Sequence, residues 1–288
     1  MMNVGVIGCG NIAETYFRAQ DYFNNINFIA CSDINLEAAK KASIEHNVEA
    51  LTIDEMLNSK NIDLILNLTI PQAHYEVSKK CLLSGKNVYS EKPMSVKFDQ
   101  AKELVNLAKE KNLYIGNAPD TFLGGGGQLS REIIDKGDIG KVLTGNFIFA
   151  FPGVQEFHPS PESWYHEGGG PVIDMGPYFF TTLVNLLGPA KNIRGRGVKF
   201  SDKREYKAGP NKGKFFDVEI PTSYMFNLEF VNETIIQGFI SFDVQNHGRN
   251  HMELYGTHGS IIVPDPNMFG GPVSVSKELG SVWVNHSV

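Results

Sequence analysis

The chain has 288 residues, of which 42% are hydrophobic and 20% charged, and its formal net charge is −6 at pH 7. This length exceeds what one compact core usually takes, so two domains are expected. The lysines and arginines are scattered, which argues against nucleic-acid binding, and no segment approaches the roughly 20 apolar residues that cross a membrane.

The first 120 residues alternate short apolar runs with helical patterns, as is typical of a parallel α/β sheet. Pro71 suits the first position of a helix, where a backbone N–H is not needed, and Gly85 suits a left-handed helix end. The predicted strands are 3–7, 27–31, 62–69, 87–89 and 113–116, and the predicted helices are 11–22, 35–46, one from 71, and 98–111.

Beyond residue 120 the pattern becomes typical of an antiparallel sheet with one buried face. Strands are predicted over 147–151, 224–230 and 234–242, and helices over 128–136 and 178–187. The predicted fold is therefore an α/β Rossmann-type parallel sheet domain, residues 1–120, and an α+β domain with a mainly antiparallel open sheet, residues 121–288.

The segment 8–13 is a G-x-G-x-x-A fingerprint between a predicted strand and a predicted helix. Gly8 permits the tight turn, Gly10 lets a diphosphate approach the backbone, and Ala13 keeps the helix close to the sheet. Asp33 ends the second strand, where a carboxylate accepts hydrogen bonds from an adenosine ribose and repels a 2′-phosphate. NAD is therefore favoured over NADP. The alternative interpretation is a structural turn with a capping acid.

The fingerprint 8–13 and the segment Ser90-Glu91-Lys92-Pro93 together resemble those of the Gfo/Idh/MocA oxidoreductases. Further likeness lies in 67–71 with His74, in 118–124 and in 168–178, so that it covers nearly the whole chain. The resemblance implies that residues 1–120 form an NAD(P)-binding Rossmann domain. It implies that residues 121–288 form an open-sheet domain that binds substrate and often mediates dimer or tetramer contacts. It also implies reversible oxidation of a hydroxyl group, usually on a sugar, polyol or related compound, by hydride transfer to a nicotinamide.

Position by position, the resemblance implies a set of cofactor-binding residues. They are Gly8, Gly10, Asn11, Ile12, Asp33, Thr69, Pro71, His74, Glu91 and Lys92. Within this set the first four would hold the diphosphate, Asp33 the adenosine ribose and Glu91 the nicotinamide ribose. Lys92 would also face the substrate, and the Lys92–Pro93 peptide is expected to be cis.

The sequence departs from the family pattern in two places. Tyr178 stands where the family often has a histidine that serves as acid/base, after Asp174. The chain also ends at Val288, where relatives usually continue with a final strand and helix. Either the chain is trimmed or the second domain lacks that segment.

Oxidation of an alcohol needs a group that takes the hydroxyl proton. Lys92 is the first candidate, against the alternative of a surface lysine on a turn. Tyr178 is the second candidate. Its pKa, ordinarily about 10, must be lowered by a cation if the phenol is to act as a base. The alternative is that Tyr178 only packs in the core. Asp174 would orient this pair or accept a substrate hydroxyl, or would cap the following helix.

An aromatic loop, residues 158–166, is a candidate wall of a sugar site, with Trp164, Tyr165 and His166 as the substrate-binding residues. The alternative is a surface loop without such a role. His247 and His251 invite a metal, but their strand-like surroundings would not place them on one face. No metal site is expected.

These patterns predict a cytoplasmic NAD-dependent dehydrogenase or reductase, a homodimer or homotetramer, whose small-molecule substrate is a carbohydrate or polyol. No membrane or nucleic-acid partner is expected. No signal peptide is expected at the start of the chain. The three cysteines are expected to be buried free thiols, as in a protein of a reducing compartment. Two alternatives stay open: a non-catalytic dinucleotide-sensing regulatory protein of the same fold, and an enzyme that reduces an imine or a cyclic enone.

Overall fold

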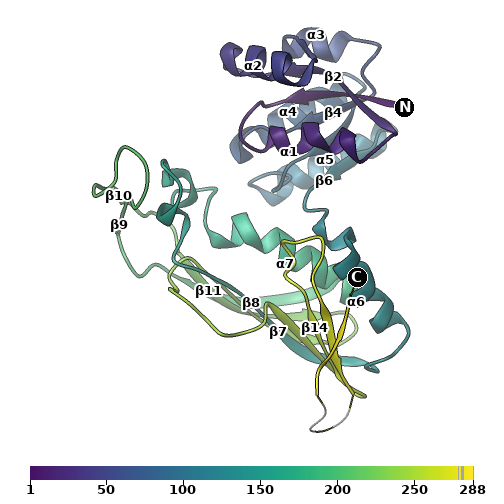
Figure 1. Cartoon of the computed structure of the whole chain (residues 1–288), viewed down its shortest axis with the longest axis vertical. Helices are drawn as coiled ribbons and strands as arrows, with labels where there is room; N and C mark the ends of the chain where they lie inside the picture. Colours follow the sequence, from purple (N-terminus) through teal and green to yellow (C-terminus); the bar gives the residue numbers. More distant parts are fainter. Residues whose placement is uncertain (278, 280–281, 288) are drawn as a thin grey trace. The chain divides into compact units, whose positions relative to one another are not determined.

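The computed structural model describes residues 1–277, 279 and 282–287. The chain divides into two compact units, Met1–Ala118 and Pro119–Val288, called unit 1 and unit 2 below. Figure 1 shows both, with unit 1 in purple to blue and unit 2 in teal to yellow. Each unit has hydrophobic clusters of its own.

Unit 1 is built on a six-stranded parallel sheet with the order β3-β2-β1-β4-β5-β6. The strands are β1 Met2–Ile7, β2 Ile26–Ser32, β3 Glu49–Ala50, β4 Leu64–Asn67, β5 Asn87–Ser90 and β6 Ile115–Asn117. This is the order of a dinucleotide-binding Rossmann sheet. All six strands are parallel, so their carboxyl ends lie along one edge of the sheet.

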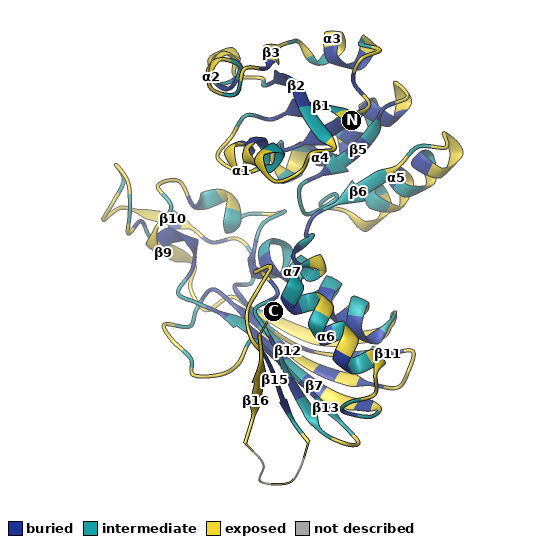
Figure 2. Ribbon diagram, turned by 45° about the vertical axis from the view of Figure 1, so that its right-hand side comes forward, coloured by how far each residue is buried: buried dark blue, intermediate teal, exposed yellow. Residues whose placement is uncertain are grey.

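Helices cover both faces of this sheet. They are α1 Ala13–Phe17, α2 Leu36–His46, α3 Ile53–Asn58, α4 Pro71–Leu83 and α5 Phe98–Glu110. One hydrophobic cluster joins the sheet to α3, α4 and α5, and another joins it to α1 and α2. Figure 2 shows the buried central strands and the exposed outer surfaces of the helices. Local sequence starts several of them: Asn35 caps α2, Thr52 forms a capping box on α3, and Pro71 opens α4.

Unit 2 contains an eight-stranded sheet with the order β16-β15-β14-β13-β7-β12-β11-β8. Its strands are β7 Val142–Ala150, β8 Ala190–Val198, β11 Ser223–Phe230, β12 Ile235–Ser241, β13 Met252–Gly256, β14 Ser260–Val263, β15 Val273–Ser276 and β16 Val284–His286. Neighbours pair antiparallel except β7 and β12, which are parallel. A separate antiparallel pair is formed by β9 Lys203–Glu205 and β10 Phe215–Asp217.

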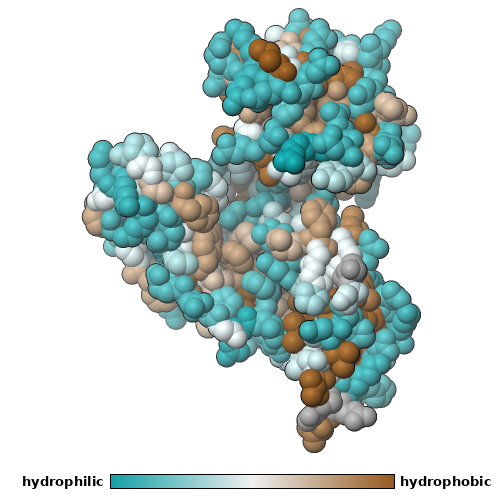
Figure 3. Space-filling model, viewed as in Figure 1, coloured by the Kyte–Doolittle hydropathy of each residue, from teal (hydrophilic) through white to brown (hydrophobic). Residues whose placement is uncertain are grey.

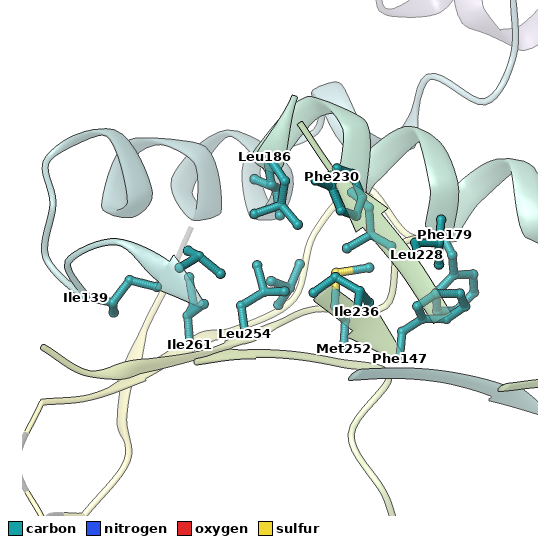
Figure 4. Packing of buried hydrophobic residues seen from close by; sticks show 14 of the residues in the cluster. Ile139, Phe147, Phe179, Leu186, Leu228, Phe230, Ile236, Met252, Leu254 and Ile261 are labelled. Atoms are coloured by element: carbon teal, nitrogen blue, oxygen red, sulfur yellow. The ribbon is translucent and has the colours of Figure 1, made fainter. Parts of the chain in front are cut away.

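The helices α6 Gly125–Asp135 and α7 Pro171–Leu187 pack on the eight-stranded sheet. Figure 4 shows Phe179 and Leu186 of α7 directed toward sheet residues such as Phe147 and Ile236. The apolar side chains of these strands alternate because every second residue faces the helices. This layer is the core of unit 2.

The predicted fold class is confirmed, with local corrections. The helix predicted over 11–22 is instead α1 followed by a 3-10 helix, Arg18–Asp21, and Ile12 is 42% exposed rather than on the inner face. α7 begins at Pro171, seven residues before the predicted start, so Pro177 lies inside the helix and not ahead of it. The short elements β3 and α3 and the strands β8–β10 and β13–β16 were not predicted.

The surface is mixed in character. Figure 3 shows hydrophilic residues over most of the visible face of unit 1, with separate hydrophobic residues among them, as is usual for a folded domain. Within the described residues, no helix has both the length and the apolar character needed to cross a membrane.

Candidate cofactor site and active-site residues

The turn after β1 requires glycine at its first position. Gly8 has a φ of +103°, and a Cβ atom there would lie 2.6 Å from the carbonyl carbon of Leu68. Its N–H donates to the Ser32 carbonyl at 2.9 Å. A side chain at Gly8 would therefore be strained and would also collide with the backbone that follows β4.

The second glycine of the fingerprint faces open space. A Cβ atom at Gly10 would meet no protein atom within 4 Å. Asn11 and Ile12 are exposed as well, and α1 follows directly. An exposed turn with room beside the backbone at the start of a helix fits a diphosphate, because N–H groups and the helix dipole favour an anion there.

Asp33 is fixed next to this turn. Its carboxylate accepts the N–H of Cys9 at 2.7 Å through Oδ2 and the N–H of Asn35 at 2.7 Å through Oδ1. The side chain is half-buried. Each carboxylate oxygen has a further lone pair, so Asp33 can still accept hydrogen bonds from ribose hydroxyls.

The cysteines near the turn are free thiols. Cys31 is buried and Cys9 is half-buried. Interaction with the Cys31 thiol, together with burial, raises the pKa of Cys9 above its ordinary value, whereas interaction with Cys9 lowers the pKa of Cys31. Burial raises the pKa of Cys81 to about 12. With their raised pKa values, the Cys9 and Cys81 thiols remain protonated at neutral pH and are poor nucleophiles.

The loop after β4 is organised by Asn67, which the sequence reasoning missed as an individual functional residue. Its Oδ1 accepts the Thr69 hydroxyl at 2.7 Å, and its Nδ2 donates to the His74 carbonyl at 3.1 Å. Pro71 opens α4 as predicted. Asn67 is fully buried, so it fixes the loop without facing a ligand.

His74 is buried, with 1% of its surface exposed. Its Nδ1 lies 2.6 Å from the Pro93 carbonyl and its Nε2 lies 2.8 Å from the Thr69 carbonyl. One carbonyl belongs to the turn after β5 and the other to the loop after β4. The imidazole thus joins two loops of unit 1.

The Glu91-Lys92-Pro93 turn follows β5, and its Lys92–Pro93 peptide is cis, as the resemblance implies. The Glu91 carboxylate accepts the Tyr16 hydroxyl through Oε1 and the Lys92 N–H through Oε2, both at 2.8 Å. Asn117 Nδ2 lies within 3.0 Å of the Ser90 hydroxyl and of the carbonyl oxygens of Ser90 and Glu91. Lys92 itself is half-buried.

In unit 2, Asp174 and Tyr178 lie four residues apart near the start of α7, and hence on one side of the helix. The Asp174 N–H donates to the Gly170 carbonyl at 3.0 Å, so Asp174 lies within the first turn. The N-cap residue is Gly170, which excludes the capping alternative for Asp174. The Tyr178 ring is half-buried and packs against the main core cluster.

The aromatic loop contains one core residue. Tyr165 is fully buried, and its hydroxyl donates to Gln155 Oε1. Burial raises its pKa to about 12. A fully buried ring cannot line a substrate site, which corrects the prediction for Tyr165. Trp164 and His166 are half-buried, and the Trp164 ring centroid lies 4.8 Å from that of His158.

An arginine that the sequence reasoning missed fixes this loop. Arg204 stacks over the Tyr165 ring at 5.1 Å and donates to the Pro152 carbonyl at 2.7 Å. It also forms a salt bridge with Asp243, and the side chains of the pair are 13% and 16% exposed. Asp243 accepts the Thr222 hydroxyl at 2.7 Å. A buried arginine among carbonyls is not visible in a sequence pattern.

The histidines of the second unit show no metal site. Among the described residues, no group of three or more His, Cys, Asp or Glu side chains is arranged to hold a metal ion. The ring centroids of His247 and His251 are 6.2 Å apart, and His251 Nε2 lies 3.7 Å from Asp265.

Two family models match consecutive parts of the chain. Residues 2–118 match the oxidoreductase family with an NAD-binding Rossmann fold, and residues 128–262 match the GFO/IDH/MocA C-terminal domain. An uncharacterized oxidoreductase of Synechocystis is 24% identical over 93% of this chain and 72% of its own length. D-xylose dehydrogenase of Paenarthrobacter nicotinovorans is 25% identical over 73% of this chain and 56% of its own length.

Solved structures share the fold. An NAD binding oxidoreductase from Klebsiella pneumoniae superposes with a TM-score of 0.84 at 20% identity, over 100% of this chain and 79% of that one. Levoglucosan dehydrogenase in complex with NADH and L-sorbose has a TM-score of 0.84 at 19% identity, with the same two coverages.

The chain belongs to the Gfo/Idh/MocA family of oxidoreductases, because the two family models together cover both units. The family description confirms the predicted class of cofactor, NAD. The matched region spans 56% of the length of the D-xylose dehydrogenase.

Proposed function

We propose that this chain is an NAD-dependent dehydrogenase or reductase acting on a CH–OH or carbonyl carbon of a sugar, polyol or related small molecule. One observation carries the proposal: the open glycine turn, Asp33 and the Glu91-Lys92-Pro93 turn follow β1, β2 and β5 at one edge of one parallel sheet. Ligands of such sheets bind at the carboxyl ends of the strands. Relatives that include D-xylose dehydrogenase and 1,5-anhydro-D-fructose reductase support the substrate class.

In this proposal the cofactor residues have separate tasks. The backbone from Gly8 to Ile12 binds the diphosphate, and Asp33 accepts the hydroxyls of the adenosine ribose. A 2′-phosphate would bring its negative charge against the Asp33 carboxylate, which favours NAD over NADP. Glu91 accepts hydroxyls of the second ribose, while Thr69 and Pro71 form the adjoining wall.

When bound, the nicotinamide exchanges a hydride with the substrate carbon. In the oxidation direction the neutral Lys92 amine accepts the proton of the substrate hydroxyl, and the ammonium so formed donates a hydrogen bond to the resulting carbonyl oxygen. Tyr178 is the second candidate for the acid/base, in the place of the family's histidine, and Asp174 on the same side of α7 orients the group or accepts a substrate hydroxyl. The half-buried Trp164 and His166 contribute an aromatic and polar wall.

The proposal includes the working form of the chain, its location and the tasks of the two units. We assign a homodimer or homotetramer as the working form and a cytoplasmic location, which suits free thiols. Unit 1 is assigned cofactor binding, and unit 2 substrate binding and oligomer contacts.

The test is a panel of sugars and polyols assayed with NAD and with NADP by NADH or NADPH absorbance, on the wild-type chain and on Lys92→Ala. Turnover with NAD that falls by at least about a hundredfold in Lys92→Ala supports the proposal. Turnover that survives the substitution refutes the role of Lys92. Binding of NADH without turnover of any compound favours the dinucleotide-sensing alternative, which the missing family histidine motivates.

A further inference from the structure

The Glu91 carboxylate is held at both of its oxygens by donors from different parts of unit 1. The Tyr16 hydroxyl donates to Oε1 at 2.8 Å, and the Lys92 N–H donates to Oε2 at 2.8 Å. The second donor is the backbone of the next residue. The first is a side chain 75 positions away in the sequence.

Tyr16 lies on α1, the helix that begins directly after the fingerprint. Its ring is half-buried and packs against the cluster that contains Ala13 and Phe17. The ring is therefore fixed by the same packing that fixes the glycine turn. Its hydroxyl reaches from that helix to the residue that follows β5.

The backbone on either side of Glu91 is fixed without Tyr16. The Glu91 N–H donates to the Asn67 carbonyl at 2.9 Å, and Asn117 Nδ2 donates to the Glu91 carbonyl at 2.9 Å. His74 holds the Pro93 carbonyl at 2.6 Å. A glutamate on such a backbone still has several side-chain rotamers, and ordering them costs free energy when a ligand binds. The Tyr16 hydroxyl fixes the side chain before any ligand arrives.

We propose that Tyr16 is a positioning residue for cofactor binding. Its hydrogen bond preorganises the Glu91 carboxylate and ties it to α1, the helix that follows the glycine turn. This inference rests on the proposed function, in which Glu91 accepts hydroxyls of the nicotinamide ribose. Tyr16 acts through Glu91 and needs no contact with the dinucleotide.

The test measures the dissociation constant of NADH, by fluorescence titration or calorimetry, so that it requires no substrate. Tyr16→Phe removes the hydroxyl and keeps the ring. Tyr75→Phe is the matched control, because the Tyr75 hydroxyl donates to a carboxylate oxygen of Glu103 at 2.7 Å between α4 and α5. Both variants lose one phenol–carboxylate bond within unit 1, and thermal unfolding without ligand compares their stabilities.

Tyr16→Phe is expected to weaken NADH binding about tenfold, while Tyr75→Phe binds NADH as the wild type does. In a Glu91→Ala background the same Tyr16→Phe change is expected to have no further effect, because its target is gone. A tyrosine that only supports the fold would weaken binding equally in both backgrounds, and that additive result would overturn the inference. If the wild-type chain does not bind NADH, the proposed function is wrong. If the wild type and Tyr16→Phe bind NADH equally tightly, only the inference about Tyr16 is wrong.

Discussion

The two units place their candidate site residues by different physical means. In unit 1 the glycine turn, Asp33 and the Glu91-Lys92-Pro93 turn each follow a strand of one parallel sheet, so the backbone positions them. In unit 2 the aromatic loop is held by side chains from distant segments, among them Arg204 and Asp243. The first kind of site depends on backbone conformation and the second on a buried polar network. Substitutions of different kinds should therefore damage each unit.

The largest effect is expected from Gly8→Val. The substitution adds a β-branched side chain at a φ of +103° and places Cβ 2.6 Å from the Leu68 backbone. We expect a loss of about 4 kcal/mol in unfolding free energy, from strain and overpacking together, and no detectable NADH binding. Urea unfolding followed by circular dichroism measures the first quantity.

Gly85→Val is the matched control for that experiment. Gly85 also has a positive φ, +79°, but a Cβ there would meet nothing within 4 Å. Only strain remains, so a loss of about 2 kcal/mol is expected. Equal losses in the two variants would mean that the contact with Leu68 does not matter.

In unit 2 the corresponding experiment is Arg204→Met. It leaves the Asp243 carboxylate, 16% exposed, without its guanidinium partner, which should cost about 3 kcal/mol. Both tryptophans, Trp164 and Trp283, lie in unit 2, so tryptophan fluorescence in urea reports on this unit. Lys191→Met breaks the exposed pair with Glu229 and should change stability by less than about 0.5 kcal/mol. A small effect of both variants would show that the network does not support unit 2.

Tyr178→Phe tests whether a single side chain of unit 2 takes part in the chemistry. If Tyr178 is the acid/base, kcat should fall by about a hundredfold, with the unfolding free energy within about 0.5 kcal/mol of the wild type. An unchanged kcat on the best substrate of the panel would assign the residue to core packing, which its contact with the main cluster already provides.

The smallest effect is expected from Asn117→Ala, compared with Asn87→Ala. Asn117 ends β6 and binds the Ser90 and Glu91 carbonyls, whereas Asn87 begins β5 at the opposite edge of the sheet and binds the Asp63 carbonyl at 3.0 Å. Each loss should cost about 1 kcal/mol of stability. Only Asn117→Ala should weaken NADH binding, by about fivefold in a titration. Equal NADH affinities of the two variants would show that the Asn117 contacts do not contribute to cofactor binding.

The sequence predicted unit 1 better than unit 2 for a physical reason. A parallel α/β sheet alternates strands and helices along the chain, and the fingerprint 8–13 and the segment 90–93 are contiguous. In unit 2, β8 carries no apolar alternation, and the parallel pairing of β7 with β12 joins strands that are far apart in the sequence. No local pattern encodes such a pairing.

The same division separates the candidate site residues that were predicted from those that were missed. Gly8, Gly10 and Asp33 act through backbone geometry and charge that a motif describes. Tyr16 and Arg204 act through hydrogen bonds to residues 75 and 39 positions away. Their importance depends on the folded neighbourhood, and a single sequence contains no signal for it.

The central place of β7 has a consequence for synthesis on the ribosome. β7 ends at Ala150, but its two neighbours in the sheet, β12 and β13, begin only at Ile235 and Met252. While the intervening chain is being made, at about 5–20 residues per second, this strand waits on the order of ten seconds with both edges open. Unit 1 can close as soon as β6 emerges. Nascent chains halted after β7 has emerged and before β12 has emerged should therefore bind chaperones through unit 2, and chains halted after β6 but before β7 has emerged should not.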